Sequence, residues 1–505
     1  MDEAKDSGYD KRLKRPSANE CSDQRPTGVE REVIDLTTAA VTKPNIILIT
    51  TDQQRYDTLA CNGNPIVRTP VIDRLAREGS RFVNSFINNT VCVPSRACLQ
   101  TGRYTHQHGV RYMESVIETT PGLPVWEETF MQRLQTAGYE TCAVGKIHMF
   151  PPKGFHETHL TNGKGQRWTT PYGSPLGPAQ LGDEYAAWLE KRHPGAYARI
   201  YEQRRTEEYR TNRAAIVNVL GTEDYIDTWI TENAIDFVSR EHRQPFFLWY
   251  GFCNPHGPVD PPAEYASLYS PDDVVLTERH LRFLNPERGL TEAVLRRWIA
   301  YYWGLCTYID DMLGRFFEVL RRRGLWDNTL IIYTTDHGEY MGEYGRFGKG
   351  LFHDCIIHAP LIIKPPAGEE VKPLVSGMVE HIDIAPTILD YAGLPIPRTV
   401  QGKSLRPLLS PASGDEGKEG DEGKEQILCE YTKNDQSSHG KCLRTRRYKY
   451  CIWSPSGPVE LYDLEEDPGE LRNVADDPGY TAVRLEMQER LLHHLSLSEK
   501  PIHIR

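Results

Sequence analysis

Residues 45–53 read NIILITTDQ, a short run of apolar and β-branched residues that ends in polar ones. A run without polar–apolar alternation is typical of a strand buried on both faces of a parallel sheet. A second segment, residues 330–337, reads LIIYTTDH and ends in the same Thr-Thr-Asp. Open α/β sheets bind their ligands at the carboxyl ends of their strands, so these two ends predict a shared site.

The segments between these strands predict helices. Residues 69–82 place apolar side chains at helical spacing behind a Thr-Pro start, and residues 291–323 predict one long helix. Strands that alternate with helices predict an α/β fold with a central, mostly parallel sheet flanked by helices. Near the end of the chain, short alternating runs predict a smaller antiparallel sheet, and residues 479–497 predict an amphipathic terminal helix.

Changes in composition divide the chain into four expected segments. Residues 1–43 are polar and charged and predict a disordered N-terminal arm. Residues 44–405 form the expected α/β domain. Residues 406–426 contain the tandem repeat GDEGKE-GDEGKE and predict a polar linker or loop, and residues 427–505 predict a C-terminal α+β subdomain.

Charge and cysteine usage exclude some classes of protein. A net charge of −11 over 505 residues argues against general nucleic-acid binding, which uses a basic face. No apolar run has the length of a signal peptide core or a membrane span, so we expect no membrane partner. The 11 cysteines are scattered singly, which favours reduced thiols and a cytoplasmic location.

The two strand ends carry candidate metal ligands. Asp52 and Gln53 end the first strand, and Asp336 and His337 end the second. Two carboxylates, an amide and an imidazole suit a divalent cation such as Ca²⁺, Mg²⁺ or Mn²⁺. The alternative is that these residues only cap the helices that follow the strands.

Residues 91–103, VCVPSRACLQTGR, hold a candidate nucleophile. Pro94 suits the first turn of a helix, which places Cys92 just outside the helix N-terminus. Free backbone N–H groups and the helix dipole stabilise negative charge there, and Arg96 adds a fixed cation. Cys92 is therefore a candidate nucleophile in an anion pocket.

The segment CVPSRACLQTGR matches the sulfatase signature Cys-x-Pro-Ser-Arg-x-x-x-x-Thr-Gly at every fixed position. The chain thus resembles the formylglycine-dependent sulfatases of the alkaline phosphatase superfamily, and this implies an alkaline-phosphatase-like fold. The resemblance also implies that Cys92 is oxidised after translation to formylglycine. The partner in this maturation is the formylglycine-generating enzyme, which reads the Pro and Arg of the motif.

Further segments are similar to the family in the expected order: GKIH at 145–148, NPHGP at 254–258, the lysine in FGKG, and the C-terminal hairpin VELYDLEEDPGE. By resemblance, Lys146 and Lys349 neutralise the non-bridging oxygens of the ester, and Arg96 holds the hydroxyl and the motif. His256 binds the ester oxygen or protonates the leaving group, and His148 orients or deprotonates the nucleophile. The alternative for each is an ordinary surface or packing residue.

The same resemblance assigns one divalent metal ion to Asp52, Asp336 and His337, with the modified Cys92 as a further ligand. Many members have Asp-Asp and Asp-Asn at these strand ends. Asp-Gln and Asp-His resemble choline-sulfatase-like and phosphonate-hydrolase-like members. This leaves Ca²⁺ and Mn²⁺ both open and makes Gln53 a peripheral ligand.

One further departure concerns residues near 358. His358 stands where relatives often carry the arginine of a supporting salt bridge, and Asp354 is expected to keep the acidic role. Three other residues are weaker candidates for the neighbourhood of the site: Arg55, His106 and His108.

The resemblance implies a sulfatase that hydrolyses a small-molecule or saccharide sulfate ester to an alcohol and inorganic sulfate. The alternative is a phosphonate monoester or phosphodiester hydrolase that uses the same formylglycine. A third reading, a non-catalytic binding protein, expects a lost cysteine or aspartate, and neither is lost. A homo-oligomer is the expected assembly.

Overall fold

The computed structural model describes residues 43–111, 122–149, 152–161, 163–164, 183–411, 423–433 and 437–499. Its main sheet has eight strands in the order β4-β3-β5-β1-β6-β7-β2-β8, and only β7 runs antiparallel to its neighbours. The predicted α/β fold with a mostly parallel sheet is confirmed. The strands are β1 (Asn45–Asp52), β2 (Ser80–Phe86), β3 (Glu140–Gly145), β4 (Glu157–Leu160), β5 (Phe246–Pro255), β6 (Thr329–Thr335), β7 (Leu361–Lys364) and β8 (Leu374–Glu380).

The segment 45–53 forms the centre of this sheet, because β1 pairs in parallel with β5 on one side and β6 on the other. Alternate side chains of β1 enter two separate cores: Ile47 and Ile49 one, Ile46 and Leu48 the other. The absence of polar alternation in the sequence is explained by this two-sided burial.

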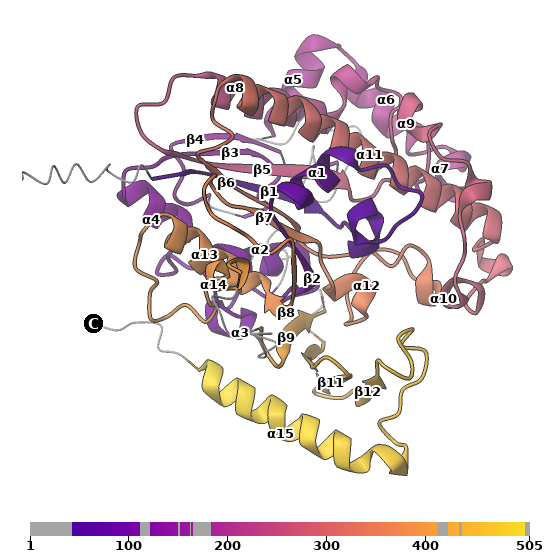
Figure 1. Ribbon diagram of the computed structural model, residues 1–505. Helices are drawn as coiled ribbons and strands as arrows, with labels where there is room; N and C mark the ends of the chain where they lie inside the picture. The colour runs from indigo at the N-terminus through magenta and orange to yellow at the C-terminus, as the bar shows by residue number, and fades with distance from the viewer. Residues whose placement is uncertain are drawn as a thin grey trace, which may run out of the picture. The chain divides into compact units, whose positions relative to one another are not determined.

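Helices cover both faces of the sheet (Figure 1). One layer contains α1 (Pro70–Glu78), α8 (Ile226–Ser239) and the long α11 (Glu292–Arg322). The other contains α2 (Cys92–Thr101), α4 (Phe130–Thr136), α13 (Ile384–Tyr391) and α14 (Arg406–Leu409). The remaining helices are α3 (Thr105–His108), α5 (Glu184–Arg192), α6 (Ala196–Gln203), α7 (Glu207–Thr211), α9 (Ala263–Ala266), α10 (Glu278–Leu281) and α12 (Asp354–Ile357).

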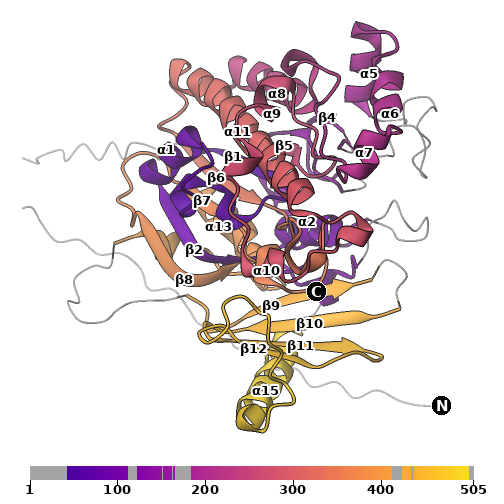
Figure 2. The same ribbon diagram turned by 90° about the vertical axis from the view of Figure 1, so that its right-hand side faces the viewer.

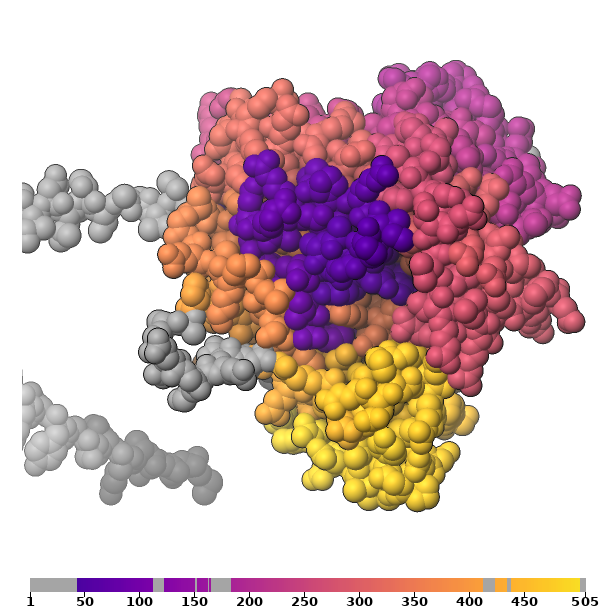
Figure 3. Space-filling view, turned by 45° about the vertical axis from the view of Figure 1, so that its right-hand side comes forward, coloured from indigo at the N-terminus to yellow at the C-terminus, as the bar shows by residue number. Residues whose placement is uncertain are grey.

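The predicted C-terminal antiparallel sheet is present, in the strand order β12-β11-β10-β9 (Figure 2). It consists of β9 (Ile427–Thr432), β10 (His439–Arg444), β11 (Tyr448–Ser454) and β12 (Glu460–Asp463), followed by the helix α15 (Thr481–Ser498). In the space-filling view these residues gather in one yellow block (Figure 3). The helix buries Met487 and Leu491, whereas Leu492 and Leu497 stay 61% and 68% exposed.

The segment 406–426 differs from the expected linker at both of its ends. It begins with α14, whose Leu409 is buried in the core. At the other end, Lys424 forms ion pairs with Glu380 at 2.5 Å and Asp383 at 2.7 Å. Residues 412–422 and the expected arm, residues 1–42, lie outside the described residues. Within the described residues, no helix combines the length and apolar character needed to cross a membrane.

His358 stands where relatives often carry the arginine of a supporting salt bridge. In this chain, Asp354 forms its salt bridges with other cations. Asp354 accepts hydrogen bonds from Arg444 of β10, at 2.9 and 3.1 Å, and from Lys449 of β11 at 2.5 Å. His358 instead contacts the carbonyl of Val83 through Nε2 at 2.9 Å. Asp354 therefore keeps its acidic role and joins α12 to the C-terminal sheet.

We predict that Asp354→Asn lowers the free energy of unfolding by about 3 kcal/mol at neutral pH, because it leaves two cations with one carboxylate fewer. Burial alone raises the pKa of Asp354, but Arg444 and Lys449 hold it well below its usual value. A lowered pKa stabilises the fold above the unfolded value of about 4, and this contribution is lost as the pH falls below it. Urea unfolding should therefore show a difference in the free energy of unfolding between the wild type and Asp354→Asn. This difference should become smaller as the pH falls below about 4.

The matched control is Asp236→Asn, which breaks an ion pair with Arg240 whose aspartate side chain is 70% exposed. Such surface pairs contribute roughly 0–1 kcal/mol. Equal losses in the two variants would show that the pairing of Asp354 does not stabilise the fold.

Candidate active site

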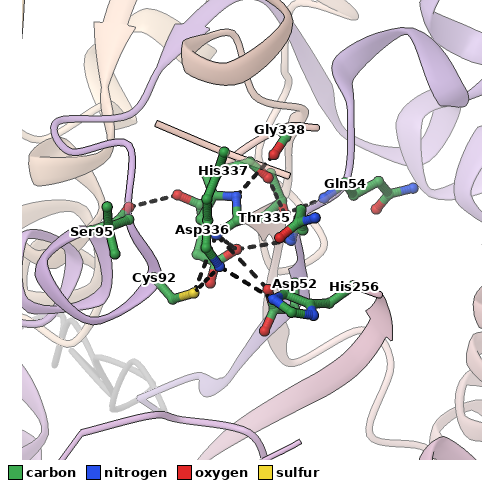
Figure 4. Close-up of polar contacts among 12 residues, drawn as sticks. Asp52, Gln54, Cys92, Ser95, His256, Thr335, Asp336, His337 and Gly338 are labelled. Atoms are coloured by element: carbon green, nitrogen blue, oxygen red, sulfur yellow. Dashed lines mark hydrogen bonds and ion pairs between the residues drawn. The ribbon is translucent and has the colours of Figure 1, made fainter. Parts of the chain in front are cut away.

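The two strands that end in Thr-Thr-Asp meet at one edge of the sheet, as predicted. Asp52 ends β1, and Asp336 and His337 follow β6. Cys92 begins α2 beside them. One potential ligand atom from each of these four buried residues lies within 4.8 Å of the others (Figure 4). The arrangement therefore brings the candidate nucleophile and the candidate metal ligands into one cluster.

The signature helix starts one residue earlier than expected. Cys92 is the first residue of α2 and Val91 is its N-cap, so Cys92 does not lie outside the helix. Pro94 falls in the first turn, where its missing N–H costs nothing. The hydroxyl of Ser95 donates to the backbone oxygen of Asp336 at 2.6 Å, which fixes the start of the helix against the end of β6.

Arg96 is 1% exposed and joins the two strand ends. Its Nε donates to Asp336 at 2.9 Å, and Nη2 lies 3.8 Å from Asp52. Nη1 donates to the backbone oxygen of Lys146 at 2.7 Å. Among the described residues, none of its hydrogen bonds goes to Cys92. Arg96 therefore orients the carboxylates. Its expected contact with the hydroxyl of a modified residue 92 stays a prediction.

The donor groups in the cluster fit a divalent cation. Both carboxylate oxygens of Asp52 are buried; Oδ2 forms an ion pair with Lys146, and among the described residues Oδ1 has no hydrogen-bond partner. Nδ1 of His337 lies 2.9 Å from the carbonyl of Gly338, which only accepts, so Nδ1 carries a proton and Nε2 is the nitrogen that can bind a cation when the ring is neutral. This Nε2 lies 3.3 Å from the Cys92 sulfur and 3.6 Å from Asp336. A buried carboxylate with one oxygen left unpartnered, beside an oriented imidazole, is a metal-ligand set.

Electrostatics around the two carboxylates agree with this. Burial alone raises the pKa of Asp52, but the cations Lys146, Lys349 and Arg96 hold it well below its ordinary value. Burial likewise opposes ionisation of Asp336, and Arg96 lowers its pKa. Both groups are therefore carboxylates at neutral pH, the form that binds a cation.

Gln53 is held in a strained conformation at the edge of the cluster. Its φ is +65°, a region that residues other than glycine rarely adopt and that often marks functional sites. Its backbone N–H donates to Asp336 at 3.0 Å, and its side-chain nitrogen contacts the carboxylate of Glu339. With its side-chain nitrogen on Glu339, the amide oxygen is the side-chain atom of Gln53 left to bind a cation.

Glu339 is a site residue that the sequence analysis missed. It is buried, and its Oε1 accepts hydrogen bonds from the backbone of Met341 at 3.1 Å and Gly348 at 2.5 Å. Its carboxylate therefore joins Gln53 to the loop that leads to Lys349. The available signal was the acidic residue two positions after His337, at the end of a buried strand.

Lys349 and His256 face Cys92. Nζ of Lys349 donates to the Cys92 sulfur at 2.6 Å and lies 3.3 Å from Nε2 of His256. Nδ1 of His256 lies 2.7 Å from the carbonyl of Gly257, so Nε2 is the nitrogen that accepts. Burial, together with Lys349 and Lys146, lowers the pKa of His256 to about 3.

The thiol of Cys92 is fully buried, yet it is acidic. Burial alone raises its pKa, but Lys349, His337 and Lys146 bring it below the ordinary value. The pocket therefore favours negative charge at residue 92, as the sequence predicted.

Lys146 and His148 approach from the end of β3. A Cβ at Gly145, whose φ is +81°, would lie 2.0 Å from the backbone oxygen of Gly251, so this position requires glycine. The chain turns there and brings Lys146 into an ion pair with Asp52. His148 has a φ of +51°, and burial with Lys146 and Arg96 lowers its pKa well below normal. Among the described residues its Nδ1 has no hydrogen-bond partner.

The weaker candidates have other partners. Arg55 pairs with Asp57 at 2.6 Å and Glu343 at 3.2 Å. His108 contacts Cys98 at 3.3 Å, and His106 contacts Glu430 of β9 at 3.1 Å. These contacts place Arg55 and His108 outside the cluster around Cys92.

The Sulfatase family model matches residues 44–394, most of the described sheet and the whole cluster. The chain belongs to the sulfatase family. A second model, the C-terminal region of N-sulphoglucosamine sulphohydrolase, matches residues 342–496 of this sulfatase. The chain is therefore a sulfuric ester hydrolase.

Individual relatives cover almost all of the sulfatase. It is 30% identical over 461 residues to an arylsulfatase from Clostridium perfringens, with 87% of this chain and 91% of the relative covered. It is 25% identical over 527 residues to an N-acetylglucosamine-6-O-sulfatase from Bacteroides thetaiotaomicron, with 89% and 86% covered. Among solved structures, the phosphonate monoester hydrolase of Agrobacterium radiobacter matches with a TM-score of 0.72 and 24% identity, over 90% of this chain and 96% of that one.

Proposed function

We propose that this sulfatase hydrolyses a sulfate ester to an alcohol and inorganic sulfate, and that Cys92, oxidised to formylglycine, is its catalytic residue. The observation that carries the proposal is the position of the Cys92 sulfur. It lies 2.6 Å from the ammonium of Lys349 and within 4.8 Å of the ligand atoms of Asp52, Asp336 and His337. No other described cysteine belongs to such a group.

Asp52, Asp336 and His337 would hold one divalent ion, Ca²⁺ or Mn²⁺, with residue 92 and the amide oxygen of Gln53 as further ligands. When bound, this ion supplies Lewis acidity that polarises the sulfuryl oxygens. The hydrate of formylglycine supplies two hydroxyls, one to attack sulfur and one whose later deprotonation releases sulfate and restores the aldehyde. Arg96 keeps the two carboxylates in place through its contacts with Asp336 and Asp52.

The remaining roles follow from position. Lys349 lies directly at residue 92, so its ammonium stabilises charge on a non-bridging oxygen as the ester bond breaks. Lys146 offsets the charge of Asp52 and serves a second oxygen of the ester. His256 presents Nε2 beside Lys349; once this nitrogen has taken up a proton, it binds the ester oxygen or protonates the leaving alcohol. The strained backbone of His148 supports its proposed role in orienting the nucleophile.

A second candidate function is hydrolysis of phosphonate monoesters or phosphodiesters at the same residue. The Asp-Gln and Asp-His strand ends favour it, and a multifunctional alkaline phosphatase superfamily protein, PehA from Trinickia caryophylli, is 30% identical to this chain over 524 residues. Sulfate monoesters and phosphonate monoesters both carry one negative charge. The fixed cations of the pocket therefore accept either, and the preference must be measured.

The test compares 4-nitrophenyl sulfate with a 4-nitrophenyl phosphonate monoester, using protein co-expressed with the formylglycine-generating enzyme. We predict that kcat/KM is at least about tenfold higher for the sulfate, since most of the sequence relatives above are sulfatases. The mass of the peptide carrying residue 92 reports conversion of thiol to aldehyde. The control is the same protein expressed without the maturation enzyme, which should keep the thiol and stay inactive. Faster turnover of the phosphonate would select the second function.

Two further parts of the proposal concern the whole molecule. A cytoplasmic location is supported by the ten described cysteines, all of which are free thiols. A homo-oligomer is supported by the leucines that α15 leaves exposed, such as Leu492 and Leu497.

A further inference from the structure

A second cavity is lined by residues of α3, β9 and β10. Figure 1 shows α3 and β9 close together. Its volume is about 210 Å³, below the roughly 300–1,000 Å³ of pockets that hold a whole ligand. Its lining includes His106, Arg111, Glu430, Tyr431 and Lys441. A cavity of this size suits one substituent of a larger molecule.

The charges of this cavity do not cancel. Glu430 is 5% exposed, accepts a hydrogen bond from the backbone of His106 at 3.0 Å, and forms an ion pair with Lys441. This pair offsets one cation. Arg111 is exposed and, within the part of the chain that the structure describes, makes no ion pair or hydrogen bond. Its guanidinium is a free, forked donor that matches sulfate or carboxylate oxygens.

The cavity is close to residue 92 along two independent paths. The backbone N–H of Thr90, two residues before Cys92, donates to the backbone oxygen of Glu430 at 3.3 Å. Two residues span at most roughly 7 Å, so this wall of the cavity lies within roughly 10 Å of the backbone of Cys92. On the other side, the ring of Tyr431 lies 3.3 Å from the place of a Cβ at Gly350. Gly350 directly follows Lys349, which contacts Cys92.

We propose that this cavity is a subsite for a second anionic group of the substrate, a sulfate or a carboxylate bound by Arg111. The inference rests on the proposed function, and it identifies the substrate as a polyanionic sulfate ester, such as a saccharide with more than one acidic substituent. The ester to be cleaved lies at residue 92, and the second group lies in the cavity, whose Glu430 wall is within roughly 10 Å of the backbone of Cys92. A simple aryl sulfate fills only the first of these positions.

The test compares Arg111→Ala with the wild type on three disaccharides: one with a single sulfate, one with two sulfates, and one with a sulfate and a carboxylate. The wild type should prefer the doubly charged esters, and Arg111→Ala should lower that preference about tenfold, mainly through KM, because one charge-assisted contact is lost. Arg111→Lys should restore part of it. The two doubly charged esters distinguish sulfate from carboxylate as the second group.

The control variant is Arg243→Ala, which removes an exposed arginine just before β5, at the end of the strands opposite to the active-site cluster. It should leave the preference unchanged. The same comparison by calorimetry on Cys92→Ala protein measures binding without turnover. An unchanged preference of Arg111→Ala in both measurements would overturn the subsite. Binding that depends on Arg111, in a matured enzyme that cleaves no sulfate ester, would instead overturn the proposed function.

Discussion

Cys92→Ser is expected to lower kcat by at least about 10⁴-fold, the largest effect we predict. Serine at this position still meets Lys349 and the metal-ligand cluster, so it can attack the ester once. It has no second hydroxyl with which to expel the sulfate. The buried side chain changes by one atom, so the fold should persist. Mass spectrometry should find a stable sulfate adduct on the introduced serine, and alcohol release should stop after one equivalent.

The matched control is Cys98→Ser, which changes the other cysteine of the same helix. Cys98 is equally buried, but its neighbours are Thr105 and His108. We expect it to retain turnover within a few-fold. If Cys92→Ser kept multiple turnover within tenfold of the wild type, a formylglycine mechanism would be excluded.

Asp52→Asn is expected to abolish metal binding and to lower kcat by at least about 10³-fold. Its carboxylate is fully buried; Oδ2 pairs with Lys146 and lies 3.8 Å from Arg96, whereas Oδ1 has no hydrogen-bond partner among the described residues. An amide removes one ligand and leaves those two cations with less opposing charge. Loss of one partner of a buried pair costs about 3–5 kcal/mol. Metal content after dialysis, measured by plasma mass spectrometry, and the free energy of unfolding should both fall.

Asp57→Asn is the control for this change. Asp57 lies a short way along the same chain segment, is 54% exposed and pairs with Arg55. It should keep the bound metal and most of the activity. A full complement of metal in Asp52→Asn would remove Asp52 from the ligand set.

The cluster was predictable because its parts follow from local patterns. Apolar, β-branched runs predict the two buried strands, and the carboxyl ends of parallel strands lie at the same edge of a sheet. That rule placed Asp52 and Asp336 together although they are far apart in sequence. The position of Pro94 likewise predicted a helix beginning near Cys92.

Other parts depend on contacts that no local pattern encodes. The role of Glu339 could not be predicted from the sequence, because it depends on hydrogen bonds from the backbone of Met341 and Gly348, which the fold of that loop brings to its carboxylate. The replacement of the expected arginine near His358 by Arg444 and Lys449 required two strands of a different sheet. The sequence periodicity also did not predict the antiparallel direction of β7, which is only four residues long.

Under the proposed function, the burial of Cys92 limits the time available for its oxidation to formylglycine. Its side chain is 0% exposed, and its sulfur is contacted by Lys349 and His337. Both of these leave the ribosome long after residue 92, tens of seconds at ~5–20 residues per second. The oxidising enzyme must act in that interval, on a chain whose catalytic edge is still open. The fraction of active molecules then depends on two rates: the rate at which Cys92 is oxidised and the rate at which the rest of the chain is synthesised and folds over it.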